Sequence, residues 1–393
     1  MKNVFHLSLP NLLRTILGRG VVSSTEAACL KFNDGKSTIL DLNMNKTSLG
    51  GMQYDKRAMA ISKTSNGVTS NGFVWDDVDL VTTKWRPQGI TTHHTFAKRY
   101  VLISWYGRAD EEYENRGGRI SFVDISQMYQ CKYNNCSYPY VHVLLVDANF
   151  CTLPNIHVGG IEQHNGILYV ADSRKGMQRI LQFDLEYDLY EVPSKMIGVM
   201  FGHHYMLRQS ASFASPIKPS FLSFDADNQK FVIGTYARCG PKVGIHLDSE
   251  SCFTQSKNQL VWFDSNNSMD VNNTILLDQH DLNMSCWHYF SEMQGATSAR
   301  VHNDTIVWVS SSYGPLADSH LHVVNVSTFT GDCSSSNLDG LVQLDRVTAY
   351  KHPPGLEDLH IEHLAEKRLL WMTTEFGCRM VFSSSLEDLL PST

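Results

Sequence analysis

Apolar strands and polar turns recur along this chain in one repeating order. Each copy opens with a short polar or glycine-containing segment and continues through two strands rich in β-branched and aromatic residues. The openings are PQGIT (87–91), VGGIE (158–162), PSFLS (219–223), QGATS (294–298) and EDLHI (357–361). Aligned on Gly89, Gly160, Phe221, Gly295 and Asp358, they are 71, 61, 74 and 63 residues apart. A repeat of this length is typical of propeller blades, so the sequence predicts an all-β chain that forms a single five-bladed β-propeller.

The last copy lacks a strand. Four copies add a further strand after the first two, at 140–147, 195–200, 273–279 and 341–350, but the chain ends at Thr393 before the fifth can do so. Because a propeller closes its ring to remove open sheet edges, we expect an N-terminal strand, 37–43 or 73–81, to fill the gap. Six blades are the alternative count. A β-sandwich is disfavoured, because it has no reason to repeat this order of turns and strands.

Composition favours one large domain and argues against a nucleic-acid partner and against a transmembrane segment. The 393 residues are 42% hydrophobic, and no Pro- or Ser-rich linker divides them. We expect residues 1–24 to be a leader or a disordered segment and residues 25–393 to form the propeller domain. A net charge of −7 without a basic cluster argues against nucleic acid. No apolar stretch approaches the roughly 20 residues of a membrane span. The sequence does not indicate the oligomeric state of the protein.

Glycosylation motifs and cysteines favour the secretory pathway, so we expect a secreted or lumenal glycoprotein. N-x-S/T motifs occur at Asn45, Asn135, Asn266, Asn272, Asn283, Asn303 and Asn325. Short-range disulfides would draw on Cys131, Cys136, Cys239, Cys252, Cys286 and Cys333. The total of nine cysteines is odd, so at least one is unpaired or intermolecular. The alternative is a cytosolic protein with buried free thiols, and His6 and Pro10 interrupt the apolar start that a leader needs.

Polar side chains that face the central channel of a propeller have no role in packing the core, so they are candidates for a functional site. We expect the five openings to meet at one mouth and to bring together the candidate catalytic residues His157, His204, Glu357 and Asp358. His157 and Asp358 could bind a divalent cation, calcium or zinc, or the imidazole could transfer a proton while a carboxylate orients it. The alternative is that these groups form hydrogen bonds between blades and hold the ring shut.

Further ligand-binding candidates lie at both ends of the predicted inner strands. The openings supply Gln88 and Gln294. The strands that follow the openings end near Arg108, Tyr236, Arg238 and Glu375, and we expect those ends to point to the opposite mouth.

Several of these segments resemble a known group of proteins. The succession PQGIT…LISWYG…RISFVDI, HVGGIEQHNGILYVADS, PSFLSFD and GLEDLHIE…LWMTTEFG, over about residues 80–385, resembles a group of largely uncharacterised secreted β-propeller proteins. More distantly it is similar to SMP-30/strictosidine-synthase-like propellers, which use a channel ion, and to plant-type glutaminyl cyclases, which are five-bladed secreted glycoproteins. The likeness to the cyclases rests on Gln88, Gly89, Tyr106 and Gly107. It implies architecture and assigns no catalytic residue.

Two classes of function follow from these observations. The first is an enzyme, a hydrolase, lyase or cyclase, that acts on a small molecule at one channel mouth, with or without a metal ion. The second is a non-catalytic, lectin-like or adhesive protein that binds a glycan through its aromatic loops.

Overall fold

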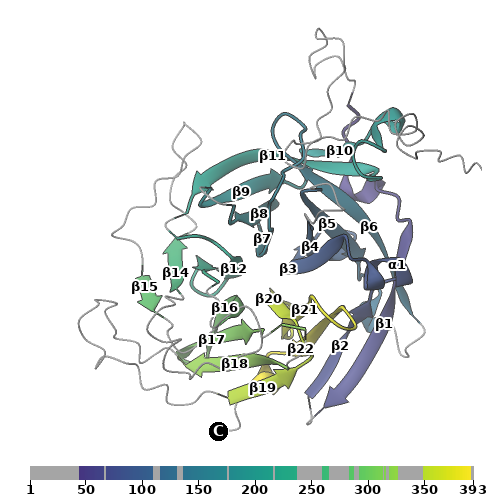
Figure 1. The fold of residues 1–393 in the computed structure, drawn as a ribbon. Coiled ribbons are helices and arrows are strands. Elements are labelled where there is room, and N and C mark those ends of the chain that lie inside the picture. The colour runs from purple at the N-terminus through teal and green to yellow at the C-terminus, as the bar shows by residue number, and fades with distance from the viewer. Residues whose placement is uncertain are drawn as a thin grey trace, which may run out of the picture.

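The chain is nearly all β, and its sheets surround a common centre (Figure 1). The computed structural model describes residues 44–65, 68–108, 116–130, 136–174, 177–215, 217–236, 259–264, 283–286, 292–312, 314–315, 318–325 and 348–390. Within that part of the chain, no helix has the length and apolar character that a membrane span requires.

The described strands pair in three sheets, one of 14 strands and two of four strands. Within these sheets we distinguish groups of strands that follow one another along the chain, and the first strand of each group lies nearest the centre (Figure 1). The first group is β3 (Trp85–His94), β4 (Arg99–Gly107), β5 (Gly118–Asp124) and β6 (Ser137–Val146). The second is β7 (Ile161–His164), β8 (Ile167–Asp172), β9 (Arg179–Asp184) and β11 (Tyr205–Ala214). The third is β12 (Phe221–Asp225), β13 (Lys230–Gly234), β14 (Gln259–Asp264) and β15 (Asn283–Cys286). The fourth is β16 (Met293–Val301), β17 (Asp304–Ser311), β18 (Ser319–Asn325) and β19 (Thr348–His352).

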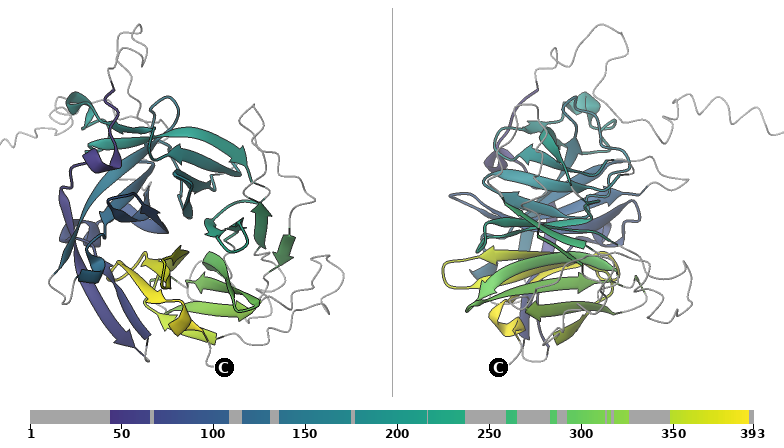
Figure 2. Two further views of the ribbon diagram at one scale, coloured as in Figure 1. Left: turned by 180° about the vertical axis from the view of Figure 1, so that it is seen from behind. Right: turned by 90° about the vertical axis from the view of Figure 1, so that its left-hand side faces the viewer.

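The fifth group combines both ends of the described chain. It contains β20 (Leu356–His363), β21 (Arg368–Thr374) and β22 (Met380–Ser385), and β22 pairs with β2 (Val68–Val74). β1 (Lys56–Ser65) then pairs with both β2 and β6. The view from behind in Figure 2 shows these yellow C-terminal strands beside the purple N-terminal ones. An N-terminal strand therefore completes the last group.

The segment that provides this strand differs from the two expected ones. Residues 37–43 lie outside the described residues. Of 73–81, only residues 73 and 74 belong to β2, and the remainder leads into helix α1 (Asp77–Val81). Residues 77–81 form a helix and not a strand because the Asp76 side chain accepts a hydrogen bond from the Asp79 amide at 2.9 Å and caps the N-terminus of that helix.

The expected further strands are confirmed in part. The segment 140–147 coincides with β6, but 195–200 begins with a single 3₁₀ turn at Ser194–Met196. The fourth strand of the second group is instead β11, which also pairs in parallel with β6. The segment 273–279 lies outside the described residues, and only the end of 341–350 falls in β19.

Apolar side chains fill the spaces between neighbouring groups. One cluster packs Trp75, Trp105 and Trp371 with Tyr140, at the junction of the first group, the fifth group and the N-terminal segment. The rings of Trp75 and Trp105 meet edge to face at 4.8 Å. The N-terminal segment is therefore part of the core, in addition to pairing at the edge of the sheet.

Candidate active site at one channel mouth

Pairing direction decides which residues meet at each end of the channel. The openings are themselves the innermost strands, and each runs antiparallel to the strand that follows it. Trp85 at the start of β3 lies opposite Gly107 at the end of β4, and Leu356 of β20 lies opposite Thr374 of β21. The start of each first strand and the end of the second therefore share one mouth. The expectation that Glu375 and Tyr236 lie at the opposite mouth from Gln88 and His157 was wrong for this reason.

A pocket of about 470 Å³ occupies this mouth and receives residues from all five groups. Five of the residues singled out in the sequence line it together: Gln88, His157, Tyr236, Gln294 and Glu375. Further lining residues were not expected, and they include Ser173, Lys218, Ser220, Glu292, Ser312 and Phe376. Most of them lie at the same positions of their own groups, at the start of a first strand or the end of a second. The antiparallel order would have identified them.

β-Bulges direct side chains toward the channel at three of the five openings. The pairing register shifts between Pro87 and Ile90 in β3, between Met293 and Gly295 in β16, and between Leu356 and Leu359 in β20. A bulge inserts an extra residue and changes the direction of a side chain without ending the strand. Gln88, Gln294 and Glu357 lie within these bulges.

Two carboxyl groups, Glu357 and Glu375, form the acidic part of the site. Glu375 lines the pocket and accepts a hydrogen bond from the Tyr106 hydroxyl at 3.2 Å, with the Arg86 guanidinium at 3.9 Å. Glu357 is only 2% exposed, and its Oε1 atom has no hydrogen-bond partner.

Both carboxyl groups are held toward their protonated form. Burial raises the pKa of Glu357 well above its ordinary value, and the neighbouring Glu375 and Asp358 raise it further. Burial also raises the pKa of Glu375, although Arg86 and Tyr106 partly offset this effect. Two nearby carboxyl groups without a full counter-charge share a proton. The pair can therefore supply a proton to a molecule in the pocket.

His157 lies at the same mouth as a neutral imidazole. Its ring stacks on Tyr106, with centroids 4.3 Å apart and planes inclined by 22°. The residue is exposed where it borders the pocket. Desolvation by the neighbouring protein atoms and the positive charge of Lys218 lower the pKa of His157 to about 4. A neutral imidazole can accept a proton, so the mouth holds a potential proton donor and a potential acceptor.

Asp358 lies deeper, between three of the five groups. It is fully buried, and its Oδ2 atom accepts hydrogen bonds from the amides of Ile90 at 3.4 Å and Ile161 at 3.3 Å. Its Oδ1 atom has no partner, and burial raises its pKa well above the ordinary value despite those amides. Asp358 thus ties β20 to β3 and β7, and it does not line the pocket.

The expected set of four catalytic residues is therefore not assembled. His204 is exposed and immediately precedes β11, the outermost strand of the second group, because the next opening starts only at 219. Arg108 is half-buried outside the pocket, where its amide donates to the Lys84 carbonyl at 3.0 Å, and Arg238 lies outside the described residues.

Across the described ranges, no group of three or more His, Cys, Asp or Glu side chains is arranged to hold a metal ion, so a cation at His157 and Asp358 stays a prediction.

The residues expected to carry glycans and disulfides are placed in part. Asn45 and Asn303 are exposed, whereas Asn325 is half-buried and donates to Asp304 at 3.0 Å. Asn283 lies in β15. Asn135, Asn266, Asn272, Cys131, Cys239, Cys252 and Cys333 lie outside the described residues. Cys136 is half-buried and Cys286 ends β15, and a short-range disulfide of each with a cysteine outside the described residues stays a prediction.

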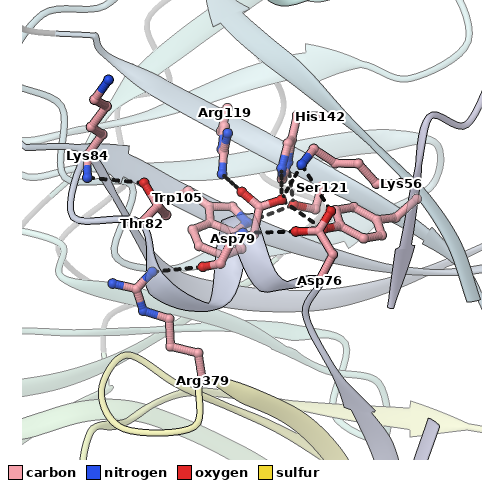
Figure 3. Close-up of polar contacts among 11 residues, drawn as sticks. Lys56, Asp76, Asp79, Thr82, Lys84, Trp105, Arg119, Ser121, His142 and Arg379 are labelled. Carbon is pink, nitrogen blue, oxygen red and sulfur yellow. Dashed lines mark hydrogen bonds and ion pairs between the residues drawn. The ribbon is translucent and has the colours of Figure 1, made fainter. Parts of the chain in front are cut away.

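A second polar cluster, around Asp79, is buried, and Asp79, Ser121 and His142 do not line the pocket at the channel mouth. The Trp105 indole donates to Ser121 at 2.7 Å, Ser121 bonds His142 at 2.8 Å, and His142 bonds Asp79 at 2.8 Å. Figure 3 shows His142, Arg119 and Lys56 all directed at the Asp79 carboxylate. A serine, histidine and aspartate in contact could form a nucleophilic triad. Ser121 is fully buried, however, so no substrate reaches it and the cluster is structural.

Comparisons with known proteins return structures but no sequence relatives. No protein family matches the sequence, and no curated protein matches it, so the likeness to SMP-30-type propellers and glutaminyl cyclases has no support from sequence. A GH43 β-xylosidase/α-arabinofuranosidase from a compost microbial metagenome matches at 10% identity and a TM-score of 0.36, over 83% of this chain and 95% of that one. A GH43_1 enzyme from Xanthomonas citri matches at 10% and 0.37 over 83% and 90%. The Malassezia sympodialis allergen Mala s 1 matches at 11% and 0.33 over 86% and 91%. Likenesses this weak assign no activity and no residue role.

Proposed function

We propose that the chain is a five-bladed β-propeller enzyme that cleaves a small hydroxylated molecule, such as a glycoside, by general acid–base catalysis at the mouth lined by Glu375 and His157. The observation that carries this proposal is the buried carboxyl pair Glu357–Glu375, which opens onto the pocket beside a neutral imidazole. Catalytic acids commonly have a pKa raised by burial and by a neighbouring like charge.

In the proposed reaction, water cleaves one single bond between the reacting centre of the substrate and the oxygen of the leaving group. His157 removes a proton from the attacking water, whose oxygen forms the new bond. Glu375 gives its proton to the leaving oxygen as the old bond breaks. The His157 proton then returns through solvent to the carboxyl pair, so water is the sole co-reactant. Glu357 acts as a positioning residue, because it keeps the proton on the pair.

The composition of the pocket is suited to a sugar-like ligand. Gln88, Gln294 and Ser312 can donate and accept hydrogen bonds, and the buried Ser312 hydroxyl has no partner of its own. Tyr236 and Phe376 add aromatic faces on which an apolar ring face can pack. The same features would serve a lectin-like protein that binds without cleaving.

Glu375→Gln separates the two functions. For an enzyme, we expect hydrolysis of a panel of chromogenic glycosides and esters to fall at least about 100-fold, because the proton donor is lost. Binding of the unreactive product sugar, measured by calorimetry, should change little. Glu366→Gln, an exposed change in the turn after β20, is the control and should leave both unchanged.

The pH profile tests the role of the same carboxyl group. Since the pKa of Glu375 is raised, its acid form persists to a higher pH than an ordinary glutamate allows. Activity should therefore fall on the alkaline side, as pH rises through that raised pKa, and the alkaline limb should be absent in the Gln variant. Sugar binding without turnover by the wild type would assign the binding function instead.

The divalent cation stays a further proposal. Elemental analysis of the purified protein checks it, since a stoichiometric calcium or zinc ion would support a metal at this mouth. An ion found in equal amount in the variants His157→Gln and Asp358→Asn would be located elsewhere.

We also propose that the protein is secreted and carries N-glycans, for which exposed Asn45 and Asn303 offer accessible acceptors. When the protein is made in a eukaryotic host, an N-glycosidase should increase its mobility on a denaturing gel. The Asn303→Gln variant should show a smaller change. Unchanged mobility together with freely titrating thiols would place the protein in the cytosol.

A further inference from the structure

One side chain, Tyr106 near the end of β4, contacts both groups of the proposed catalysis. Its hydroxyl donates to Glu375 Oε1 at 3.2 Å, and its ring stacks on the His157 imidazole with centroids 4.3 Å apart. Tyr106 is half-buried and is not among the residues that line the pocket. It therefore contacts the acid and the base without bordering the space that a ligand would occupy.

The alternation of side chains along β4 explains this position. Successive residues of a strand point to opposite faces. Trp105 belongs to the apolar cluster between the first and fifth groups, whereas Tyr106 packs against the cluster that joins the first and second groups. His157 lies in the segment that leads into β7 of the second group, and Glu375 directly follows β21 of the fifth. The side chain of Tyr106 thus connects three groups of strands.

The charged and titratable groups around Glu375 come from β3, β4, β20 and the turn after β21. The Arg86 Nε atom lies 3.9 Å from Glu375 Oε1, Glu357 is the acidic neighbour, and the Arg379 guanidinium donates to the Glu375 carbonyl at 3.1 Å. Burial raises the pKa of Tyr106, and the charge of Glu375 raises it further, so its hydroxyl stays a donor. A donor of this kind favours the ionised form of the carboxyl group that accepts from it.

We propose that Tyr106 is a positioning residue, which holds the Glu375 carboxyl through its hydroxyl and the His157 imidazole through its ring, and so fixes the two relative to each other. The inference rests on the proposed function, which gives these groups their roles as acid and base. Proton transfer needs both groups within reach of the reacting atoms, and a small displacement of either lowers the rate. The hydroxyl also limits how far burial raises the pKa of Glu375.

Tyr106→Phe tests the contact with Glu375, because it removes the hydroxyl and keeps the ring. Carbon NMR titration of the full chain, with isotope-labelled glutamate carboxyl groups and the Glu375 signal assigned by its loss in Glu375→Gln, needs no substrate. We expect the titration midpoint of Glu375 to move to higher pH in Tyr106→Phe, since a donor to the ionised form is lost. Tyr54→Phe is the control, because it removes a hydroxyl that bonds Tyr100 at 3.0 Å near the other end of β4.

Hydrolysis by the same variants provides the second measurement. In Tyr106→Phe, kcat should fall about tenfold while KM stays within about twofold of the wild type, because Tyr106 does not line the pocket. The alkaline limb of the pH profile should move to higher pH, since the acid form of Glu375 then persists further. Tyr106→Leu also removes the ring and should lower kcat by about 100-fold. A purely structural role would lower the melting temperature without moving that limb.

An unmoved Glu375 midpoint in Tyr106→Phe would overturn the inference whether or not the protein is active. Equal activity of Tyr106→Phe and Tyr106→Leu would overturn the role of the ring. A midpoint that moves in a protein without hydrolytic activity would support the contact between Tyr106 and Glu375 and overturn the proposed catalysis, so the two failures are distinguishable.

Discussion

At the scale of single residues, the carboxylate of Asp79 connects helix α1 with β1 and with the strands β5 and β6 of the first group. Its oxygens bond Arg119 at 2.8 Å and Lys56 at 2.9 Å, in addition to His142 (Figure 3). They also accept a hydrogen bond from the Tyr140 hydroxyl at 2.7 Å. Burial would raise the pKa of Asp79, but His142, Arg119 and Lys56 outweigh it, so the pKa lies far below the ordinary value. This charge holds α1 against the first group of strands.

The His142 ring in this cluster is neutral. Burial and the cation of Arg119 lower its pKa to about 4, although Asp79 opposes them. Arg119 and Lys56 already balance the charge of Asp79, and this ionised carboxylate can only accept a hydrogen bond from His142 Nε2, at 2.8 Å. The proton of the neutral ring therefore lies on Nε2, and Nδ1 accepts a hydrogen bond from the Ser121 hydroxyl.

Asp79→Asn should lower the free energy of unfolding by about 3–5 kcal/mol, because it leaves the buried Arg119 without its counter-charge. Urea denaturation at pH 7 measures the change. Asp77→Asn removes an exposed charge from the same helix and should cost no more than about 1 kcal/mol. Equal effects of the two substitutions would show that the Asp79 charge contributes little.

Some residues of the site could be identified from sequence and others could not. Gln88, Gln294 and Glu375 were identified because polar residues at strand ends have no role in a core. Lys218 was missed because it precedes the opening at 219–223 by one residue, and Ser312 was not singled out although it lies near the polar end of its expected strand. His204 was misplaced because proximity to an opening along the chain was taken for proximity in space.

At the scale of the elements, the sequence pattern does not show the order of the strands from the channel outward. Both strands of each inner hairpin are apolar and β-branched, so the pattern predicts two strands without indicating which is innermost. The order is decided by close packing at the centre. A Cβ atom on Gly160 would lie 2.2 Å from the Leu222 amide, and one on Gly295 would lie 2.6 Å from the Cα atom of Asp358. Only backbone fits there, which places the openings nearest the axis.

Gly72 allows the same kind of close approach where β2 meets β22. A Cβ atom at this position would lie 2.0 Å from the Val381 carbonyl oxygen and 2.5 Å from the Cα atom of Phe382. Because both are backbone atoms, the strands must separate to relieve the contact. Gly72→Ala should therefore lower the free energy of unfolding by about 3 kcal/mol or more.

Thermal and urea unfolding of this variant check the prediction. The neighbouring Asn71→Ala is the control, since the Asn71 side chain is exposed and the substitution keeps the backbone carbonyl that accepts from Ser383. A Gly72 variant as stable as this control would mean that the seam between β2 and β22 does not limit stability.

At the scale of the whole molecule, strands from opposite ends of the described chain pair with each other. β2 covers the edge of β22, and β1 continues the sheet to β6 of the first group. Without them, β22 would present unpaired backbone groups to solvent, and the aromatic cluster around Trp75 would lose one wall. The repeat spacing predicted that such a strand was needed, but only pairing across the ring shows which segment provides it.

Removal of residues 1–82 should therefore abolish the single cooperative unfolding transition. It deletes β1, β2 and α1, opens two sheet edges, and leaves Arg119 without Asp79. Calorimetry and near-ultraviolet circular dichroism should show a broad, weak transition in place of a sharp one. A peptide of residues 56–82 added in trans should restore part of the signal, because β2 can pair with β22 without a covalent link. A truncated chain that melts as sharply as the full one, at the same temperature, would show that the remaining groups close the ring among themselves.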